Sequence, residues 1–111
     1  MIVSERDVEA YLRRRVESLG GLCLKFPAVY EEGIPDRLLV LPGGKTIFVE
    51  MKRPRGGKLS SMQKYQHSRL RRRGAVVFVL KNKGEVDRML KEVMPNEVHA
   101  AQIPDRSDPE N

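Results

Sequence analysis

The sequence predicts a small α/β domain in which a mixed central sheet is flanked by helices, in the order α-β-β-β-α-β-α. Two observations support this fold class. Three segments carry apolar residues at the three- and four-residue spacing of an amphipathic helix, and short apolar runs typical of strands lie between them. The chain of 111 residues is long enough to bury one core and too short for two.

The first helix is predicted to begin after Ser4, with Asp7 as its partner in a weak capping box. Apolar residues then recur at helical spacing from Val8 to Leu19, and two glycines at positions 20 and 21 end the run. The short apolar segment from Leu22 to Phe26 follows and ends at a proline. We expect it to form the first strand.

A hairpin is predicted in the middle of the chain. Two strand-like runs, Arg37 to Leu41 and Thr46 to Val49, are separated by the turn sequence Pro42-Gly43-Gly44-Lys45. The preceding segment 28–35 contains a glycine and a proline, and we expect it to be a loop.

The second half of the chain predicts a helix, a strand and a helix. Ser60 or Ser61 caps a helix that runs to about Arg73. The nearly continuous apolar run from Ala75 to Leu80 is typical of a strand buried on both faces. The segment 84–93 has helical spacing again. Residues 1–94 therefore form the predicted domain, and the proline-containing segment 95–111 is expected to be a flexible tail.

The composition excludes several classes of protein. One cysteine cannot build a disulfide scaffold, and no Cys/His cluster has zinc spacing. The longest apolar runs are far shorter than the roughly 20 residues that span a bilayer. Because charged residues follow directly after Ser4, we expect no secretory signal, no membrane partner and a cytoplasmic location.

Positive charge is concentrated in one part of the sequence. The net charge is +6, and no acidic residue occurs between Glu50 and Glu85. The same stretch holds eleven lysines and arginines, which favours binding of a polyanion, with nucleic acid as the first candidate. The alternative is a solvated helix face that only keeps the protein soluble.

Three polar residues flank the predicted hairpin. Asp36 opens one strand, Glu50 ends the other, and Lys52 follows on the same side because side chains alternate along a strand. The hairpin register places Asp36 almost opposite Glu50. Two carboxylates in that position repel each other unless a positive charge lies between them. As single residues, Asp36 is also consistent with a turn, and Glu50 with Lys52 is also consistent with an exposed ion pair.

A hard divalent cation would satisfy this arrangement. Mg²⁺ binds to one or two carboxylates together with water and phosphate oxygens, and the main-chain carbonyl of Met51 could add another oxygen. Such an ion acidifies bound water and neutralises charge on a phosphate. Lys52 could orient the attacking water and offset charge on the phosphoryl oxygens. These residues therefore indicate a phosphodiester hydrolase.

The same residues resemble a known nuclease signature. Pro35-Asp36, thirteen further residues and Glu50-Met51-Lys52 are similar to the PD-(D/E)xK pattern, whose restriction-endonuclease-like core has the predicted order of elements. The closer resemblance is to the VRR-NUC family. It rests on the segments Gly33-Ile34-Pro35-Asp36-Arg37, Val49-Glu50-Met51-Lys52, Ser60-Ser61-Met62-Gln63 and Leu70 to Gly74, and covers about residues 5–93.

The resemblance implies roles for individual residues. Asp36 and Glu50 would bind Mg²⁺ or Mn²⁺, and Lys52 would be the catalytic lysine. Glu9 best matches a first-helix glutamate that reaches the metal through water, and Glu5, one turn earlier, is the alternative. Gln63 matches a glutamine beside the site, although its distance from Ser60 also suits a capping box.

The resemblance also implies a substrate. We expect a metal-dependent endonuclease of bacterial or phage type that acts as a homodimer on branched DNA, like a Holliday-junction resolvase. The alternatives are a nicking or flap-type nuclease that acts as a monomer, and a catalytically silent nucleic-acid-binding module. The expected contacts to nucleic acid come from the basic residues that follow the third strand, namely Lys52, Arg53, Arg55, Lys58 and Lys64.

Two other side chains receive structural interpretations. His67 has no partner in the sequence, so we expect it at the surface or partly buried and not as a metal ligand. Cys23 is expected to be a small buried apolar residue.

Overall fold

The computed structural model describes residues 3–27 and 31–96, and its elements follow the predicted order. The predicted tail at 95–111 lies, after its first two residues, outside the described residues, as does part of the predicted loop at 28–35. The elements are α1 (Glu5–Ser18), β1 (Leu22–Lys25), β2 (Arg37–Leu41), the 3₁₀ turn η1 (Pro42–Gly44), β3 (Lys45–Met51), α2 (Ser61–Arg72), β4 (Val77–Leu80) and α3 (Lys83–Val93).

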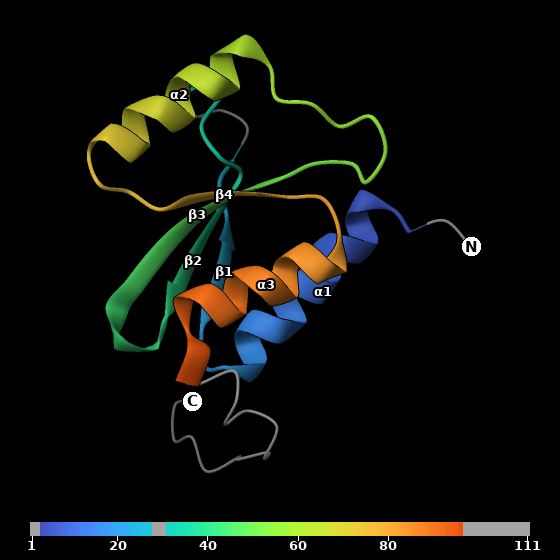
Figure 1. Cartoon of the computed structure of the whole chain (residues 1–111), viewed down its shortest axis with the longest axis vertical. Helices are drawn as coiled ribbons and strands as arrows, with labels where there is room; N and C mark the ends of the chain where they lie inside the picture. The colour runs from blue at the N-terminus through green and yellow to red at the C-terminus, as the bar shows by residue number, and fades with distance from the viewer. Residues whose placement is uncertain (1–2, 28–30, 97–111) are drawn as a thin grey trace.

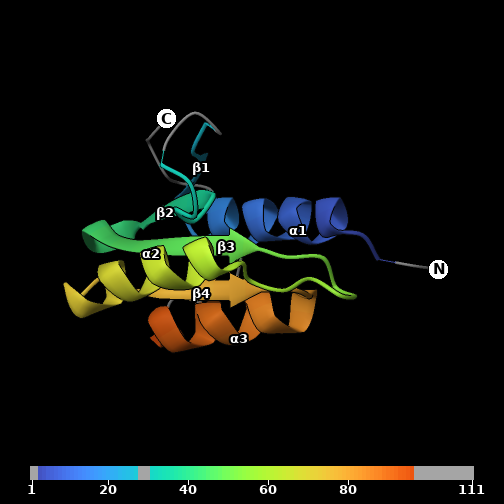
Figure 2. The ribbon, with the colours of Figure 1, turned by 90° about the horizontal axis from the view of Figure 1, so that it is seen from above.

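The four strands form one mixed sheet in the order β1-β2-β3-β4. β1 pairs with β2 and β2 with β3 in antiparallel fashion, which confirms the predicted hairpin, and β3 pairs with β4 in parallel. Since parallel neighbours need a crossover, α2 connects β3 to β4. Figures 1 and 2 show α2 on one side of the sheet and α1 with α3 on the other.

The main core lies between the sheet and the pair α1 and α3. α1 presents a stripe at four-residue spacing, Val8, Leu12 and Val16, and all three side chains are fully buried. The alternating apolar residues of β2 and β3 belong to the same buried cluster as this stripe, and Cys23 is buried there as expected. The core residues from the sheet and α3 include Leu39, Leu41, Ile47, Val49, Leu80, Val86, Met89 and Leu90.

Both predicted capping boxes are confirmed in atomic detail. The hydroxyl of Ser4 accepts a hydrogen bond from the main-chain N–H of Asp7, and the Asp7 carboxylate accepts one from the main-chain N–H of Ser4. The hydrogen bond from the main-chain N–H of Ser4 to the carboxylate lowers the pKa of Asp7, and the nearby Ser4 hydroxyl acts in the same direction. Ser60 and Gln63 form the equivalent capping box at the start of α2.

The last strand differs in part from the prediction. β4 begins at Val77 and not at Ala75, and it is the final strand in the sheet order. Val77 and Leu80 are buried, whereas Phe78 and Val79 are only partly buried. Both faces of β4 are covered as predicted, one by α2 and the other by α3, and each face carries one buried and one partly buried residue. Within the described segments no helix is long and apolar enough to cross a membrane.

Candidate active site

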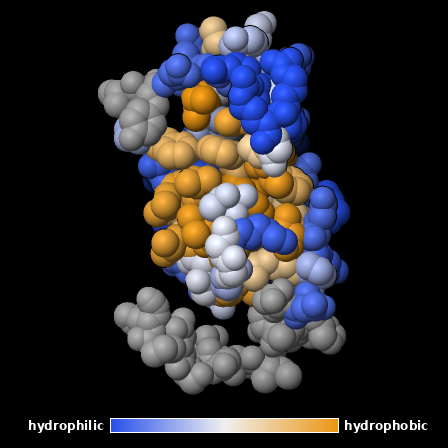
Figure 3. Space-filling view, turned by 90° about the vertical axis from the view of Figure 1, so that its left-hand side faces the viewer, coloured by the Kyte–Doolittle hydropathy of each residue, from blue (hydrophilic) through white to orange (hydrophobic). Residues whose placement is uncertain are grey.

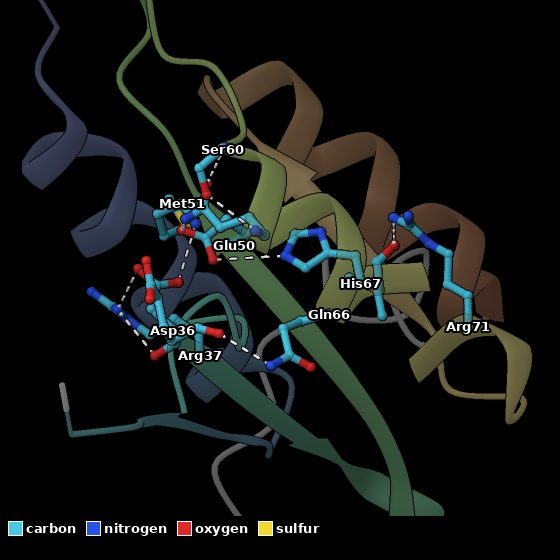
Figure 4. A network of polar contacts seen from close by, with 11 residues as sticks. Asp36, Arg37, Glu50, Met51, Ser60, Gln66, His67 and Arg71 are labelled. Atoms are coloured by element: carbon cyan, nitrogen blue, oxygen red, sulfur yellow. Dashed lines mark hydrogen bonds and ion pairs between the residues drawn. The ribbon is translucent and has the colours of Figure 1, made fainter. Parts of the chain in front are cut away.

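Asp36 and Glu50 meet where the hairpin strands run side by side. Arg37 pairs with Val49 in the antiparallel register, so the next pair along the ladder joins Asp36 and Glu50. The main-chain N–H of Met51 donates a hydrogen bond of 3.1 Å to Oδ1 of Asp36 and holds this carboxylate at the end of β3. Figure 4 shows the two carboxylates close to each other, as the sequence predicted.

Glu50 is a buried carboxyl group, with only 5% of its surface exposed. Burial raises its pKa to about 7, and the negative charge of Asp36 adds to the effect while Lys52 opposes it. Its Oε2 accepts a hydrogen bond of 3.2 Å from Nε2 of Gln63. Its Oε1 is buried and has no hydrogen-bond partner in the described part of the chain. One oxygen of Glu50 is therefore available to a ligand.

Opposing effects act on the pKa of Asp36, and its net shift is upward. Burial raises its pKa, whereas the positive charge of Arg37 and the N–H of Met51 lower it. Nη1 of Arg37 lies 3.1 Å from Oδ2 of Asp36. The Arg37 side chain is almost fully buried, because position 37 points to the same side of β2 as Leu39 and Leu41. Sequence reasoning missed this arginine, although a charged residue at the inward position of an alternating strand was visible.

Gln63 takes part in the capping box of α2 and also contacts Glu50. Its Oε1 accepts a 2.9 Å hydrogen bond from the main-chain N–H of Ser60, which completes the capping box. Its Nε2 is then directed at Glu50. A helix cap thus positions a donor beside the carboxylate.

His67 contradicts the expectation that it lies at or near the surface. Its side chain is completely buried, and its Nε2 lies 3.9 Å from Oε1 of Glu50. Both ring nitrogens lack a hydrogen-bond partner among the described residues. Burial lowers its pKa, and the positive charges of Arg71 and Lys52 act in the same direction. His67 therefore faces Glu50 as a neutral imidazole at neutral pH.

A signal for His67 was present in the helix pattern. Residues three and four apart lie on one face of a helix, so Gln63, Gln66 and His67 share a face of α2. That face is directed at the sheet, and Gln66 and His67 are the buried residues of the helix. A helix that turns polar side chains inward indicates that it covers a polar site.

The two first-helix glutamates lie in different surroundings. Oε2 of Glu9 is 3.3 Å from Arg13 and 3.5 Å from Nε of Arg37, so two cations already neutralise it. Glu5, one turn earlier, has no such ion pair in the described residues. Its charge contributes to the raised pKa of Glu50. The role of Glu9 at the metal stays a prediction, and Glu5 is the glutamate whose charge reaches Glu50.

The basic residues of the predicted nucleic-acid surface follow β3. Arg53, Arg55, Lys58 and Lys64 are exposed, and Lys52 is partly buried. Lys52, Lys58 and Lys64 line one hollow, which also includes Lys81. Lys81 is an addition to the predicted residues, because it lies seventeen residues beyond Lys64 in the chain and comes near Lys52 only through the pairing of β3 with β4.

The donor set suits a hard cation held by few protein ligands. No three His, Cys, Asp or Glu side chains within residues 3–27 and 31–96 converge as a metal cluster. Mg²⁺ needs only one or two carboxylates beside water and phosphate oxygens. Asp36 and Glu50 provide those carboxylates, and the buried unpaired Oε1 of Glu50 is the atom that a cation would satisfy. The proposed carbonyl ligand at Met51 stays a prediction.

Comparisons with known proteins identify relatives of this chain. No family model matches the chain. The chain is 42% identical over 79 residues to "Putative nuclease p44" of Acyrthosiphon pisum secondary endosymbiont phage 1, which covers 71% of this chain and 84% of that protein. A solved structure described as a VRR_NUC domain superposes with a TM-score of 0.73 at 39% identity, covering 78% of this chain and 94% of the other.

These likenesses extend over most of both relatives, and for the solved structure they include the fold. The mixed sheet with helices on both sides agrees with the PD-(D/E)xK fold of the structural relative. The chain therefore belongs to the VRR-NUC family of nucleases.

Proposed function

We propose that this protein is a Mg²⁺- or Mn²⁺-dependent endonuclease that hydrolyses phosphodiester bonds of DNA. One observation carries the proposal. Asp36 and Glu50 occupy paired positions on neighbouring strands, and Oε1 of Glu50 is buried without a partner in the described residues. Such an arrangement is costly for a protein unless a cation completes it.

Each residue then has a chemical task. Asp36 and Glu50 would hold the cation, and the main-chain carbonyl of Met51 would add an oxygen. When bound, the cation supplies acidified water and neutralises charge on the phosphate. Lys52 lies on the face of the sheet that carries Glu50 and would orient the attacking water and offset charge on the phosphoryl oxygens.

The side chains around Glu50 would position it. Gln63 donates to Oε2, and His67 lies against Oε1. For the first-helix acid, the contacts support Glu5 over Glu9, because Glu9 is paired with Arg13 and Arg37 whereas Glu5 has no ion pair among the described residues. Replacing each glutamate separately by glutamine distinguishes the two, since only the residue near the metal should weaken the dependence of cleavage on Mg²⁺.

The direct test is cleavage of labelled junction, flap and linear DNA with Mg²⁺, Mn²⁺ or EDTA. Asp36→Ala and Lys52→Ala should each lower the rate by at least about 100-fold, because each removes a group that acts on the reacting phosphate. Glu92→Gln, at an exposed position on α3, is the matched control. Parent-like rates in Asp36→Ala would refute the mechanism. Binding without cleavage in any metal would support the silent binding module.

We also propose a preference for branched DNA and a homodimeric state. The preference comes from the resemblance to stand-alone family members, and a dimer would deliver two cuts to a symmetric junction.

An apolar sheet face supports the dimer. Leu22 is 56% exposed and Leu24 44%, and the strand register places Leu38 and Val40 on the same face. Figure 3 shows a broad apolar area on this side of the molecule.

The dimer has its own test. Leu22→Lys combined with Leu24→Lys should convert a dimer to a monomer, because buried unpaired charges oppose association. Mass in solution measured by light scattering reports the result, with Val3→Lys as a control at an exposed apolar position elsewhere. A monomeric parent protein at micromolar concentration would instead support the monomeric nicking or flap-type nuclease.

A further inference from the structure

A hollow lined by four lysines lies next to the carboxylate pair. Its volume is about 370 Å³, within the range of sites that bind small ligands. Lys52, Lys58, Lys64 and Lys81 contribute to its lining, and we call it the lysine pocket. Three separate segments form it: the loop after β3, the start of α2 and the end of β4.

The sheet brings two of these lysines together. Glu50 pairs with Val79 and Met51 with Leu80 in the parallel register of β3 and β4. The main-chain N–H of Lys52 donates a 3.0 Å hydrogen bond to the carbonyl of Leu80. The next position places Lys52 beside Lys81, on the face of the sheet that carries Glu50. The lysine pocket therefore opens on the side of the sheet where the carboxylates lie.

The loop that closes the pocket is tightly built. A Cβ atom at Gly57 would lie 2.7 Å from the main-chain N and O of Arg53, so only glycine allows the chain to approach itself so closely there. This close approach holds the segment that carries Lys58 against the end of β3. The wall of the pocket is thus a packed turn.

The ammonium groups of the four lysines are not in direct contact with acids of the described residues. None of them forms an ion pair or a side-chain hydrogen bond with another described residue, whereas Arg13, Arg15, Arg37 and Arg69 each pair with an acid. The carboxylate of Glu85 accepts a hydrogen bond from the main-chain N–H of Lys81, not from its ammonium group. Four like charges around one hollow repel each other and favour an anion between them.

We propose that the lysine pocket binds one phosphate group of the nucleic acid, a different one from the phosphate that is cut, and thereby selects which phosphate reaches Asp36 and Glu50. The inference rests on the proposed function and extends it. Lysine binds phosphate as a mobile point charge with three donors, and a contact to phosphate carries no information about the base. The phosphate is either an internal phosphodiester next to the cut or a terminal phosphate. Lys52, which lies between the pocket and the carboxylates, links binding to reaction.

The test combines a variant of the pocket with altered DNA. Lys64→Met with Lys81→Met removes two charges, keeps the apolar stems and leaves the catalytic Lys52 in place. Lys91→Met, at an exposed position on α3, is the matched control for loss of a lysine. Affinity is measured by fluorescence anisotropy in EDTA over a range of salt. The logarithm of the association constant falls as the logarithm of the salt concentration rises. We expect the magnitude of this slope to decrease by about 1 to 2 in the double variant and to change less in the control.

The position of the phosphate is found with modified strands. One set carries a single neutral methylphosphonate at successive positions around the cut, and another has or lacks a 5′-terminal phosphate. In the parent protein one modification should lower affinity and raise KM with little change in kcat. In the double variant the same modification should have no further effect, because both changes remove one contact. An effect of one methylphosphonate indicates an internal phosphate, whereas an effect of the 5′-terminal phosphate indicates a terminal one.

Two outcomes would overturn the inference. The double variant could bind and cleave like Lys91→Met, or every modification could lower affinity to the same extent in the parent and the double variant. Failure of the proposed function looks different. In that case the parent protein cleaves no DNA in Mg²⁺ or Mn²⁺, while the binding data in EDTA still decide whether the pocket holds a phosphate.

Discussion

Glu50→Gln is expected to stabilise the metal-free protein while abolishing its activity. The buried carboxyl group has a pKa of about 7 against an ordinary value of 4.5. Below pH 4.5 it is protonated in both the folded and the unfolded protein. As the pH rises from 4.5 to 7, the unfolded chain ionises and the folded one does not, so the free energy of unfolding falls.

The magnitude follows from the difference between the two pKa values. Each unit of pKa corresponds to about 1.4 kcal/mol, so ionised Glu50 lowers the free energy of unfolding by about 3 kcal/mol above pH 7. Glutamine has no charge to bury, and its side-chain carbonyl can still accept from Gln63. The variant should therefore match the parent near pH 4.5 and exceed it by up to about 3 kcal/mol at pH 8.5.

Urea unfolding in EDTA at pH 4.5, 6 and 8.5 measures this difference. Glu92→Gln controls for removal of an exposed carboxylate and should follow the parent at each pH. Addition of Mg²⁺ should raise the stability of the parent at pH 8.5 and have little effect on Glu50→Gln, since only the parent keeps both carboxylates. If Glu50→Gln differs from the parent by the same free energy of unfolding at all three pH values, Glu50 is not a buried carboxyl group with a raised pKa.

Three further predictions concern residues of the helices and loops around the site. Leu12→Ala removes a fully buried side chain of α1 and should lower the free energy of unfolding by about 2–5 kcal/mol in urea; an unchanged midpoint would contradict the packing of α1 on the sheet. Ser60→Ala removes the hydroxyl that accepts from the main-chain N–H of Gln63 and should lower the free energy of unfolding by about 1 kcal/mol in urea, while Ser60→Thr should restore it; cleavage should stay near the parent rate because the main-chain N–H of Ser60 still holds the Gln63 side chain, and an unchanged midpoint in Ser60→Ala would contradict the cap. Gly33→Ala should destabilise the protein in thermal unfolding by more than Gly43→Ala, because both glycines have positive φ but only at Gly33 would the Cβ meet Met62, 2.6 Å from its main-chain oxygen; equal effects would show that backbone strain alone matters.

Local chemistry explains how much of this protein can be predicted from its sequence. A Ser or Thr hydroxyl caps the helix that follows it, so both capping boxes were predictable within four residues. The hairpin places Asp36 opposite Glu50 because a short turn fixes the register of the two strands that it joins. Alternation along β3 then places Lys52 on the side of Glu50. The central pair of carboxylates and its lysine thus depend on distances of sixteen residues or fewer.

The remaining parts of the site depend on how α1, α2 and β4 pack on the hairpin. Burial of His67 against Glu50 follows from the side of the sheet on which α2 lies, and no local pattern specifies that contact. Arg37 joins Glu9 to Asp36 only because α1 packs beside β2. Lys81 reaches Lys52 through the parallel pairing of β4. Sequence periodicity determined which residues form each element and which side chains share a face, whereas the burial that raises the pKa of Glu50 arises only when the elements exclude water together.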